Sequence, residues 1–125
     1  MIFKIRTCKE TMEMFKQITA SDNLQPFILS KLAISMSIKS EESLSDKDFK
    51  TDNEGLELNR QTITGEFDEL YKCLIENFEG RHLNEDEYVG KYLKAHLDRG
   101  AKMIFGEYQY ARDFISQLLS EERGL

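Results

Sequence analysis

Residues 1–39 decide the fold: MIFKIRTCKETMEMFKQITASDNLQPFILSKLAISMSIK. The opening residues alternate in character, with Phe3 and Ile5 on one side of the chain and Lys4 and Arg6 on the other. Alternation of β-forming and polar residues is typical of a half-exposed strand. The N-terminus is therefore predicted to form one short strand, and the elements after this strand determine the class of fold.

Two helices are predicted after this strand. Apolar residues at helical spacing indicate a helix over about residues 8–20, and the polar residues 21–23 end it. Pro26 suits the first position of a helix, because its missing N–H has no partner there in any case. The second helix is therefore predicted over residues 26–39.

The helix over residues 26–39 is apolar around most of its circumference, with serines and lysines as the only interruptions. A helix of this kind must be buried on nearly all sides. Two placements satisfy that requirement, and the sequence leaves both open. One is a central core helix, and the other is a helix at the interface between subunits.

The predicted strand needs a partner, because an isolated strand leaves backbone N–H and C=O groups unpaired. No second convincing strand is evident elsewhere in the sequence. The simplest partner is the same strand of a second copy, antiparallel across a two-fold axis. We therefore predict a mainly α fold, in which an N-terminal ribbon-helix-helix-like strand-helix-helix pairs between chains and a helical C-terminal part comes after it.

The whole chain, residues 1–125, is predicted to be a single domain. After residues 1–39, a surface linker with six acidic and two basic side chains occupies residues 40–55. Residues 56–125 form the helical part. We expect three helices there: one ending at Gly80, one running from an Asn84 cap to about residue 104 with Gly100 bending or ending it, and a last one over about 107–121.

Composition excludes several classes of protein. The chain has 125 residues and a net charge of −6, and it contains no apolar run long enough to span a membrane and no signal peptide. A cytoplasmic protein is therefore expected. Cys8 and Cys73 are expected to be buried and unpaired, and they share no metal-ligand spacing with His82 or His96, so no metal site is predicted.

Catalytic motifs are absent from the sequence. It holds no glycine-rich phosphate loop, no HExxH and no CxxC. The carboxylate pairs fall on expected helix surfaces and caps. Ser30, Ser35 and Ser37 lie on the buried helix, and no nearby histidine is expected to activate them. The chain is therefore predicted not to be an enzyme and to need no cofactor.

The basic N-terminal part is the best candidate for binding a polyanion. Lys4 and Arg6 share the outer strand face, Lys9 comes next at the helix entrance, and Lys31 lies in the first turns of the second helix. In a ribbon-helix-helix protein the outward strand side chains enter the DNA major groove. The alternative is that a half-exposed strand simply carries polar residues on its outer face.

A compact polar segment precedes the helix that ends at Gly80. In the functional interpretation, Asn59 and Arg60 contact phosphate or a partner protein, and Arg60 becomes a fifth candidate for DNA contact. In the alternative, both residues belong to a structural turn. In the structural interpretation Thr64 caps the helix, Gly65 gives the turn and Glu66 complements the helix dipole. The residues alone favour the structural interpretation.

The segment LELNRQTITGEFDEL, residues 56–70, closely resembles the central signature of the DndE family of DNA sulfur modification proteins. The stretches PFILSKLA at residues 26–33 and AHLDRG at residues 95–100 agree in order and spacing. The positions that match the family pattern are Ser30, Asn59, Arg60, Thr62, Thr64, Gly65, Glu66, His96, Arg99 and Gly100.

The resemblance implies a role in bacterial DNA phosphorothioation, in which sulfur replaces a non-bridging phosphate oxygen. The sulfur chemistry belongs to other members of the machinery, among them a cysteine desulfurase, an ATP-pyrophosphatase-like subunit and an ATPase subunit. The DndE member has no assigned catalytic activity and resembles a tetrameric component that binds nicked duplex DNA. The predicted function is thus a non-catalytic DNA-binding subunit that forms a dimer or tetramer; the alternative is an adaptor that holds the sulfur-modification enzymes together without touching DNA.

Overall fold

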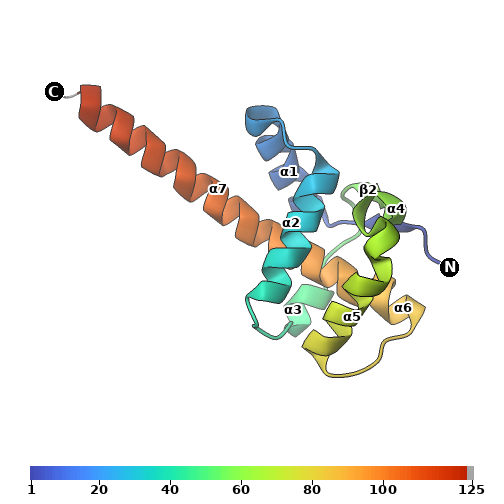
Figure 1. Cartoon of the computed structure of the whole chain (residues 1–125). Helices are drawn as coiled ribbons and strands as arrows, with labels where there is room; N and C mark the ends of the chain where they lie inside the picture. Colours follow the sequence, from blue (N-terminus) through green and yellow to red (C-terminus); the bar gives the residue numbers. More distant parts are fainter. Residues whose placement is uncertain (124–125) are drawn as a thin grey trace.

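The structure, a computed structural model, describes residues 1–123 (Figure 1). For residues 114, 115, 117, 118 and 121–123 it describes the backbone alone. Helices dominate, and one of them, α7 (Lys94–Arg123), runs through the centre and projects from one end. Among the described residues, no helix combines the length and the apolar character required to cross a bilayer.

A two-stranded sheet ties the N-terminus to the middle of the chain. Strand β1 (Lys4–Arg6) pairs antiparallel with β2 (Glu57–Asn59), with Ile5 opposite Leu58. The partner strand therefore comes from the same chain, and the prediction that no second strand exists is wrong. Pairing of β1 between chains, and with it the ribbon-helix-helix arrangement, loses the premise on which it was predicted. Strand β2 was missed because it has three residues, two of which, Glu57 and Asn59, are poor strand formers.

The two N-terminal helices agree closely with the sequence pattern. Helix α1 (Lys9–Asp22) ends at Asn23, which adopts the left-handed conformation with φ 58°. Helix α2 (Pro26–Lys39) begins at the proline and has the predicted bounds. One side of α2 is buried against α7, whereas Phe27, Ile28 and Leu32 on its other side are 37%, 37% and 47% exposed. Helix α2 is thus a core helix that also presents an apolar outer face.

Helix α7 extends a continuous helical run. Asn84 caps α6 (Glu85–Glu87), a π-helical turn η2 (Tyr88–Leu93) comes next, and α7 continues without a break. The predicted end near residue 104 and the separate last helix are therefore wrong. A Cβ atom at Gly100 would lie 1.7 Å from the carbonyl oxygen of Ala33, so this glycine permits close contact between α7 and α2 and does not end the helix.

Short helical elements interrupt the connecting segments. Residues 40–55 contain a short helix, α3 (Asp46–Phe49), and its Phe49 ring packs edge-to-face on Tyr92 with centroids 5.2 Å apart. Helix α4 (Arg60–Ile63), the turn η1 (Gly65–Phe67) and α5 (Asp68–Glu79) come after β2. Gly80 ends α5 as predicted, with φ 76°.

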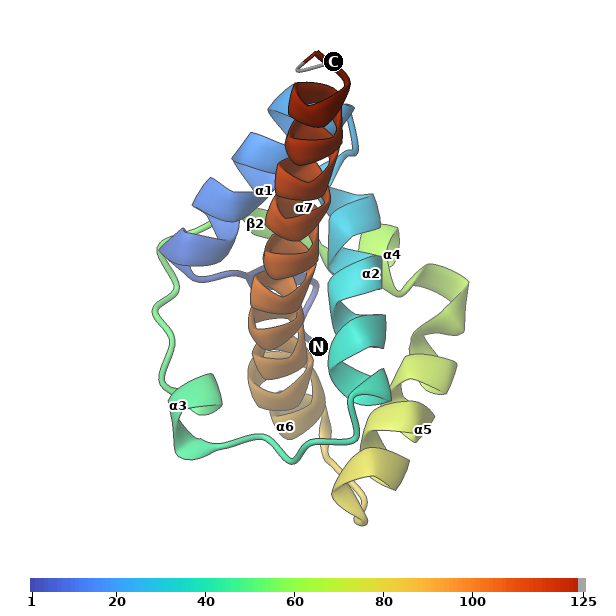
Figure 2. The ribbon, with the colours of Figure 1, turned by 90° about the vertical axis from the view of Figure 1, so that its left-hand side faces the viewer.

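The core lies where the first half of α7 is surrounded by α1, α2 and α5 (Figure 2). Fully buried side chains on its members include Phe15, Leu29, Ile34, Ile75 and Leu97. The second half of α7 continues past the ends of the other helices. This arrangement places the family-pattern residues on α2, around α4 and on the first half of α7, and leaves Lys4 and Arg6 of β1 exposed.

Candidate nucleic-acid interface and the motif network

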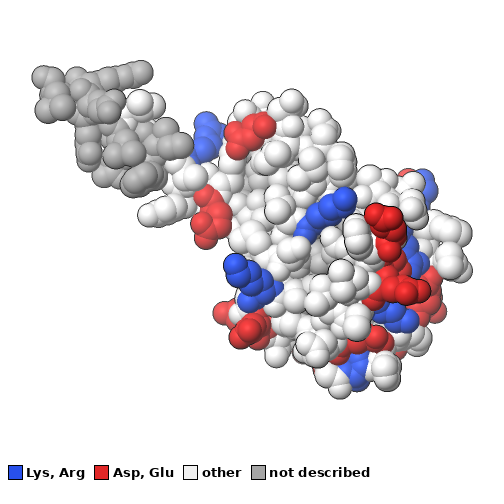
Figure 3. All heavy atoms as spheres, in the orientation of Figure 1, with Lys and Arg blue, Asp and Glu red and all other residues white. Residues whose placement is uncertain are grey.

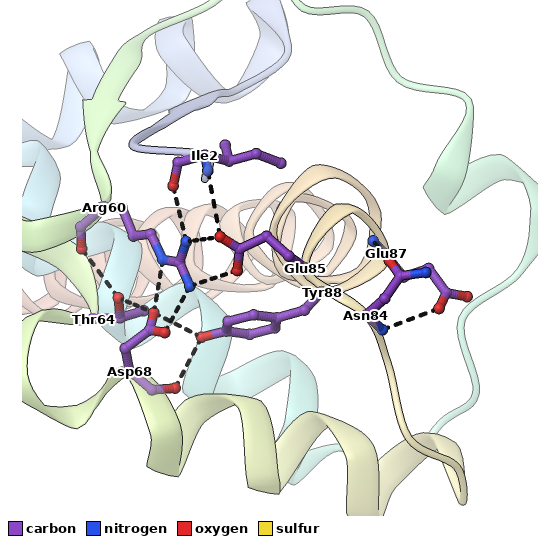
Figure 4. Close-up of polar contacts among 8 residues, drawn as sticks. All are labelled: Ile2, Arg60, Thr64, Asp68, Asn84, Glu85, Glu87 and Tyr88. Carbon is purple, nitrogen blue, oxygen red and sulfur yellow. Dashed lines mark hydrogen bonds and ion pairs between the residues drawn. The ribbon is translucent and has the colours of Figure 1, made fainter.

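Arg60 is the centre of a partly buried network that joins the N-terminal segment, α4, α5, α6 and η2 (Figure 4). Its guanidinium donates two hydrogen bonds to Asp68, at 3.0 and 2.7 Å, and two to Glu85, at 2.8 and 3.0 Å. A fifth bond reaches the carbonyl oxygen of Ile2 at 2.9 Å. The centroid of the Tyr88 ring lies 5.5 Å from the guanidinium carbon. Five bonds match the five N–H donors that an arginine has.

These contacts perturb the titration of every member. Hydrogen bonds to Asp68 and Glu85 raise the pKa of Arg60 further above its ordinary value. Burial raises the pKa of Asp68, but hydrogen bonds from Arg60, Thr64 and Tyr88 together lower it below its usual range. The hydrogen bond from Arg60 likewise lowers the pKa of Glu85. All three groups are therefore held in their charged forms at neutral pH.

The network favours the structural interpretation of Arg60. Its side chain is 14% exposed, and a phosphate would have to displace existing hydrogen bonds to reach it. Thr64, which was expected to cap the next helix, instead donates to Asp68 at 2.6 Å. Gly65 adopts φ 51° and provides the expected turn, while Asn59 caps α4 by accepting from the Gln61 N–H at 3.1 Å. DNA contact by Arg60 stays an untested prediction.

A second buried network joins the end of α2 to α7. Arg99 donates from Nε to Ser37 Oγ at 2.8 Å and from an Nη to the carbonyl oxygen of Glu42 at 2.7 Å. Ser37 Oγ also lies 2.8 Å from His96 Nδ1. Arg99 can only donate, so Ser37 Oγ accepts from its Nε–H and keeps its own hydrogen and a second lone pair for the bond with His96 Nδ1. The expectation that no histidine lies near the serines of α2 is therefore wrong for Ser37. The family-pattern residues His96 and Arg99 thus fix the loop after α2.

His96 is held neutral in this network. Burial, with a contribution from Arg99, lowers its pKa to about 4. Its Nε2 lies 3.8 Å from Glu79 Oε1, and neither atom has a hydrogen-bond partner among the described residues. Burial raises the pKa of Glu79. Ser37 and His96 are both 0% exposed, so no substrate can approach this serine–histidine pair as it stands.

Lys4 and Arg6 lie together on the exposed face of β1. Both contact the same carboxylate, Glu57 on β2, at 3.4 and 3.1 Å, and their side chains remain 62% and 55% exposed. Two cations therefore share one anion, and exposed ion pairs of this kind are weak. Lys9 lies at the start of α1, where its side chain is exposed and its backbone N–H donates to Asp52 at 2.8 Å.

Lys31 belongs to a different part of the surface. It lies on α2 with its ammonium group 5.8 Å from the Phe27 ring centroid, and it lines a hollow of about 280 Å³. The motif positions Thr62, Gly65 and Glu66 line the same hollow. The remaining motif residue on α2, Ser30, is buried and donates to the carbonyl oxygen of Pro26 at 2.7 Å. The motif positions thus divide into a buried structural set and an exposed set beside Lys31.

Sequence reasoning missed several residues on which these networks depend. Asp98 is 1% exposed and accepts from Thr11 at 2.8 Å and from Lys94 at 2.7 Å, which anchors α1 to α7. The spacing of Lys94 and Asp98 on one helical face was the available signal. Asp68 and Glu85 carried no such signal, because their partner Arg60 comes from another element.

The cysteines differ from the sequence-based expectation in one respect. Cys73 is exposed rather than buried, whereas Cys8 is buried as predicted, and both are free. Within the described part of the chain, no group of acidic, histidine and cysteine side chains is placed to hold a metal ion.

Known structures share this helical arrangement. The crystal structure of DndE from Escherichia coli B7A involved in DNA phosphorothioation modification aligns with a TM-score of 0.66 and 20% identity, covering 81% of this chain and 96% of that one. The crystal structure of a DndE G21/24K mutant involved in DNA phosphorothioation aligns with a TM-score of 0.65 and 20% identity, covering 82% and 97%. At this identity the likeness establishes the fold.

The sequence itself establishes the family. Residues 4–112 match the family of the DNA sulphur modification protein DndE, so the chain belongs to the DndE family. The resemblance seen in residues 56–70 is thereby confirmed. No curated protein matches the sequence. The match ends at residue 112, so residues 113–123 of α7 lie outside the part shared with the family.

Proposed function

We propose that this protein is a non-catalytic, DNA-contacting subunit of the bacterial DNA phosphorothioation machinery and acts in the cytoplasm. The observation that carries the proposal is the exposed pair of cations, Lys4 and Arg6, on the outer face of β1 in a member of a DNA sulfur modification family. The related crystal structures are described as involved in DNA phosphorothioation. Duplex DNA, nicked or intact, is the proposed ligand.

The electrostatics support a contact through phosphates. Lys4 and Arg6 together carry two positive charges against the single carboxylate of Glu57, and Lys9 adds another nearby in sequence. Phosphate contacts position a protein on DNA without reading its sequence, and their strength falls as salt rises. Because the whole chain has a net charge of −6, DNA binding through other faces is disfavoured.

Two further features of the molecule bear on catalysis and on assembly. The serine–histidine pair of Ser37 and His96 is sealed in the interior, which agrees with a subunit that leaves catalysis to other proteins. The proposed partners are an ATP-pyrophosphatase-like subunit and an ATPase subunit of the same machinery. Self-association as a dimer or tetramer is proposed as well, since the exposed apolar face of α2 meets the expectation of an interface helix.

A second candidate function is an adaptor without direct DNA contact. The observation in its favour is that Arg60, the arginine of the family signature, uses all of its donors inside the protein. The negative net charge points in the same direction. In that case the basic strand face would bind an acidic surface on a partner enzyme.

DNA titration across a salt series separates the two functions. Wild type is compared with Lys4→Ala/Arg6→Ala and with a charge-matched control, Lys16→Ala/Lys47→Ala, whose lysines are exposed elsewhere. The proposal predicts that the strand variant loses affinity and that its dependence of log K on log salt becomes shallower by about two, roughly one for each lost phosphate contact. Equal affinities for all three proteins, or no binding by folded wild type at low salt, would exclude the strand face as the DNA site.

A further inference from the structure

The last part of α7 forms a helical arm. Residues 113–123, defined here as the arm, continue the helix beyond the ends of α1 and α2 and extend away from the body (Figures 1 and 2). At a rise of 1.5 Å per residue the arm is about 16 Å long. Since the family match ends at residue 112, this segment is not explained by the part that the chain shares with its relatives.

The arm has the sequence of an amphipathic helix. Apolar residues recur at helical spacing in DFISQLLSEER, with Phe114, Ile115, Leu118 and Leu119 among polar neighbours. Leu119 is the member of this set whose side chain is described, and it is 47% exposed. An amphipathic helix gains its stability in water by covering its apolar side. The arm therefore calls for an apolar surface on which to pack.

Such a surface lies at the base of the arm. A hollow of about 310 Å³ opens between α1, α2 and α7, and we call it the groove. Its lining is mostly apolar and includes Ile18, Leu24, Leu32, Met36, Ile104 and Tyr108. The exposed outer face of α2 continues it. Figure 3 shows a largely uncharged area over α1 and α2, with charged side chains gathered mainly toward the edges of this face.

The arm cannot enter the groove of its own chain. Ile104, Tyr108 and Ala111 line the groove and lie on α7 itself, and the arm is the direct continuation of that helix. Because α7 is uninterrupted and forms one wall of the groove, it carries the arm away from the groove of its own chain. We propose that the arm of one copy packs into the groove of a second copy and that the exchange is reciprocal, about a two-fold axis near Ala111.

The dimensions fit this arrangement. With an axis near Ala111, the two α7 helices cross antiparallel, so that residues after 111 in one copy meet residues before 111 in the other. The small side chain of Ala111, which is exposed, permits the crossing. Residues 26–36 of α2, which run along the groove, span about 16 Å, close to the length of the arm.

This inference specifies the surface for the proposed self-association and is independent of DNA binding. The test uses the full chain with Cys73→Ser, which removes the exposed thiol and leaves only the buried Cys8. Leu32→Cys and Leu119→Cys are introduced together; both positions are exposed, so folding is retained. Mild oxidation is expected to give a covalent dimer from the double variant. Neither single variant, nor Leu119→Cys with Asn53→Cys on the exposed loop, is expected to do so.

Sedimentation analysis of two charge variants provides the second part of the test. Leu32→Glu in the groove and Leu119→Glu in the arm are each expected to weaken the dimer at least tenfold, while circular dichroism shows unchanged helix content. Dimers that form in both variants and do not cross-link would overturn the arm exchange while leaving self-association standing. A monomeric wild type would remove self-association and the exchange together, and the DNA titration across the salt series would still decide DNA binding.

Discussion

Arg6 ends β1, and Arg60 directly follows β2 at the opposite end of the small sheet. The two arginines differ in exposure and in their bonding partners. Arg6 is 55% exposed and shares a single carboxylate, Glu57, with Lys4. Arg60 is 14% exposed and makes five hydrogen bonds with Asp68, Glu85 and Ile2. A place in the family motif therefore does not by itself make an arginine available to DNA. Its burial and the number of its free donors decide the role.

The largest expected effect comes from breaking the buried arginine. Arg60→Met leaves the carboxylates of Asp68 and Glu85 without their cation, so we expect unfolding to become easier by about 3 kcal/mol in chemical denaturation. Asp68 and Glu85 are partly exposed, which keeps the loss at the low end for such a pair. A loss under about 0.5 kcal/mol would contradict the structural role of Arg60.

Gly100 tests another motif position inside the same region. Gly100→Ala places a Cβ atom 1.7 Å from the Ala33 carbonyl oxygen, so α2 and α7 must move apart. We expect a loss of about 2–3 kcal/mol of stability. Gly106→Ala on the same helix is the matched control: its Cβ meets nothing within 4 Å, and it should stabilise the protein by up to about 1 kcal/mol. Equal effects at both positions would contradict the close packing.

The pH dependence of stability tests the His96 network. The pKa of His96 is 6.5 in the unfolded chain and is lowered to about 4 by burial in the folded protein. The unfolded state therefore binds more protons between these values, and stability falls as the pH falls below 6.5. We expect a loss of about 2 kcal/mol from this group between about pH 7.5 and 5.

The variant His96→Asn isolates this contribution. Asparagine offers a polar atom near the position of Nδ1 and does not titrate. The raised pKa of Glu79 acts in the opposite direction, because the folded state keeps that proton to higher pH. Comparison of the two proteins in denaturation curves cancels the Glu79 contribution to first order. Parallel stability profiles for wild type and His96→Asn would show that His96 is not held neutral.

The smallest expected change in stability comes from replacing the exposed arginine, Arg6. Arg6→Met should change the free energy of unfolding by less than about 0.5 kcal/mol, because surface ion pairs contribute little. Its DNA affinity should nevertheless fall, most clearly at low salt. Loss of stability comparable with that of Arg60→Met would place Arg6 in the structural set as well.

The helices were largely predictable because their signals are local. Pro26 marks the start of α2, Gly80 ends α5, and Asn84 caps α6 through bonds to nearby residues. Strand β2 has no comparable local signal. It forms because residues 57–59 meet β1 from a distant part of the chain, which only the folded structure arranges.

The site was predictable in its residues but not in their roles. The resemblance over residues 56–70 covers Arg60 and Asp68, yet their partners Glu85 and Tyr88 lie on later elements that no sequence pattern linked to them. Gly100 was interpreted as a helix breaker, since a glycine needed for helix contact has the same local appearance as one that ends a helix. Tertiary contact therefore supplied the information that local sequence lacked.

We propose that Arg6 contacts DNA while Arg60 supports the fold. The most direct measurement follows the arginine Nε–H signals of isotope-labelled protein by nuclear magnetic resonance during titration with nicked duplex DNA. The account predicts that the Arg6 signal shifts with added DNA, while the Arg60 signal exchanges slowly with solvent and stays in place. A shift of the Arg60 signal with an unchanged Arg6 signal would contradict it and move the DNA site to the motif arginine.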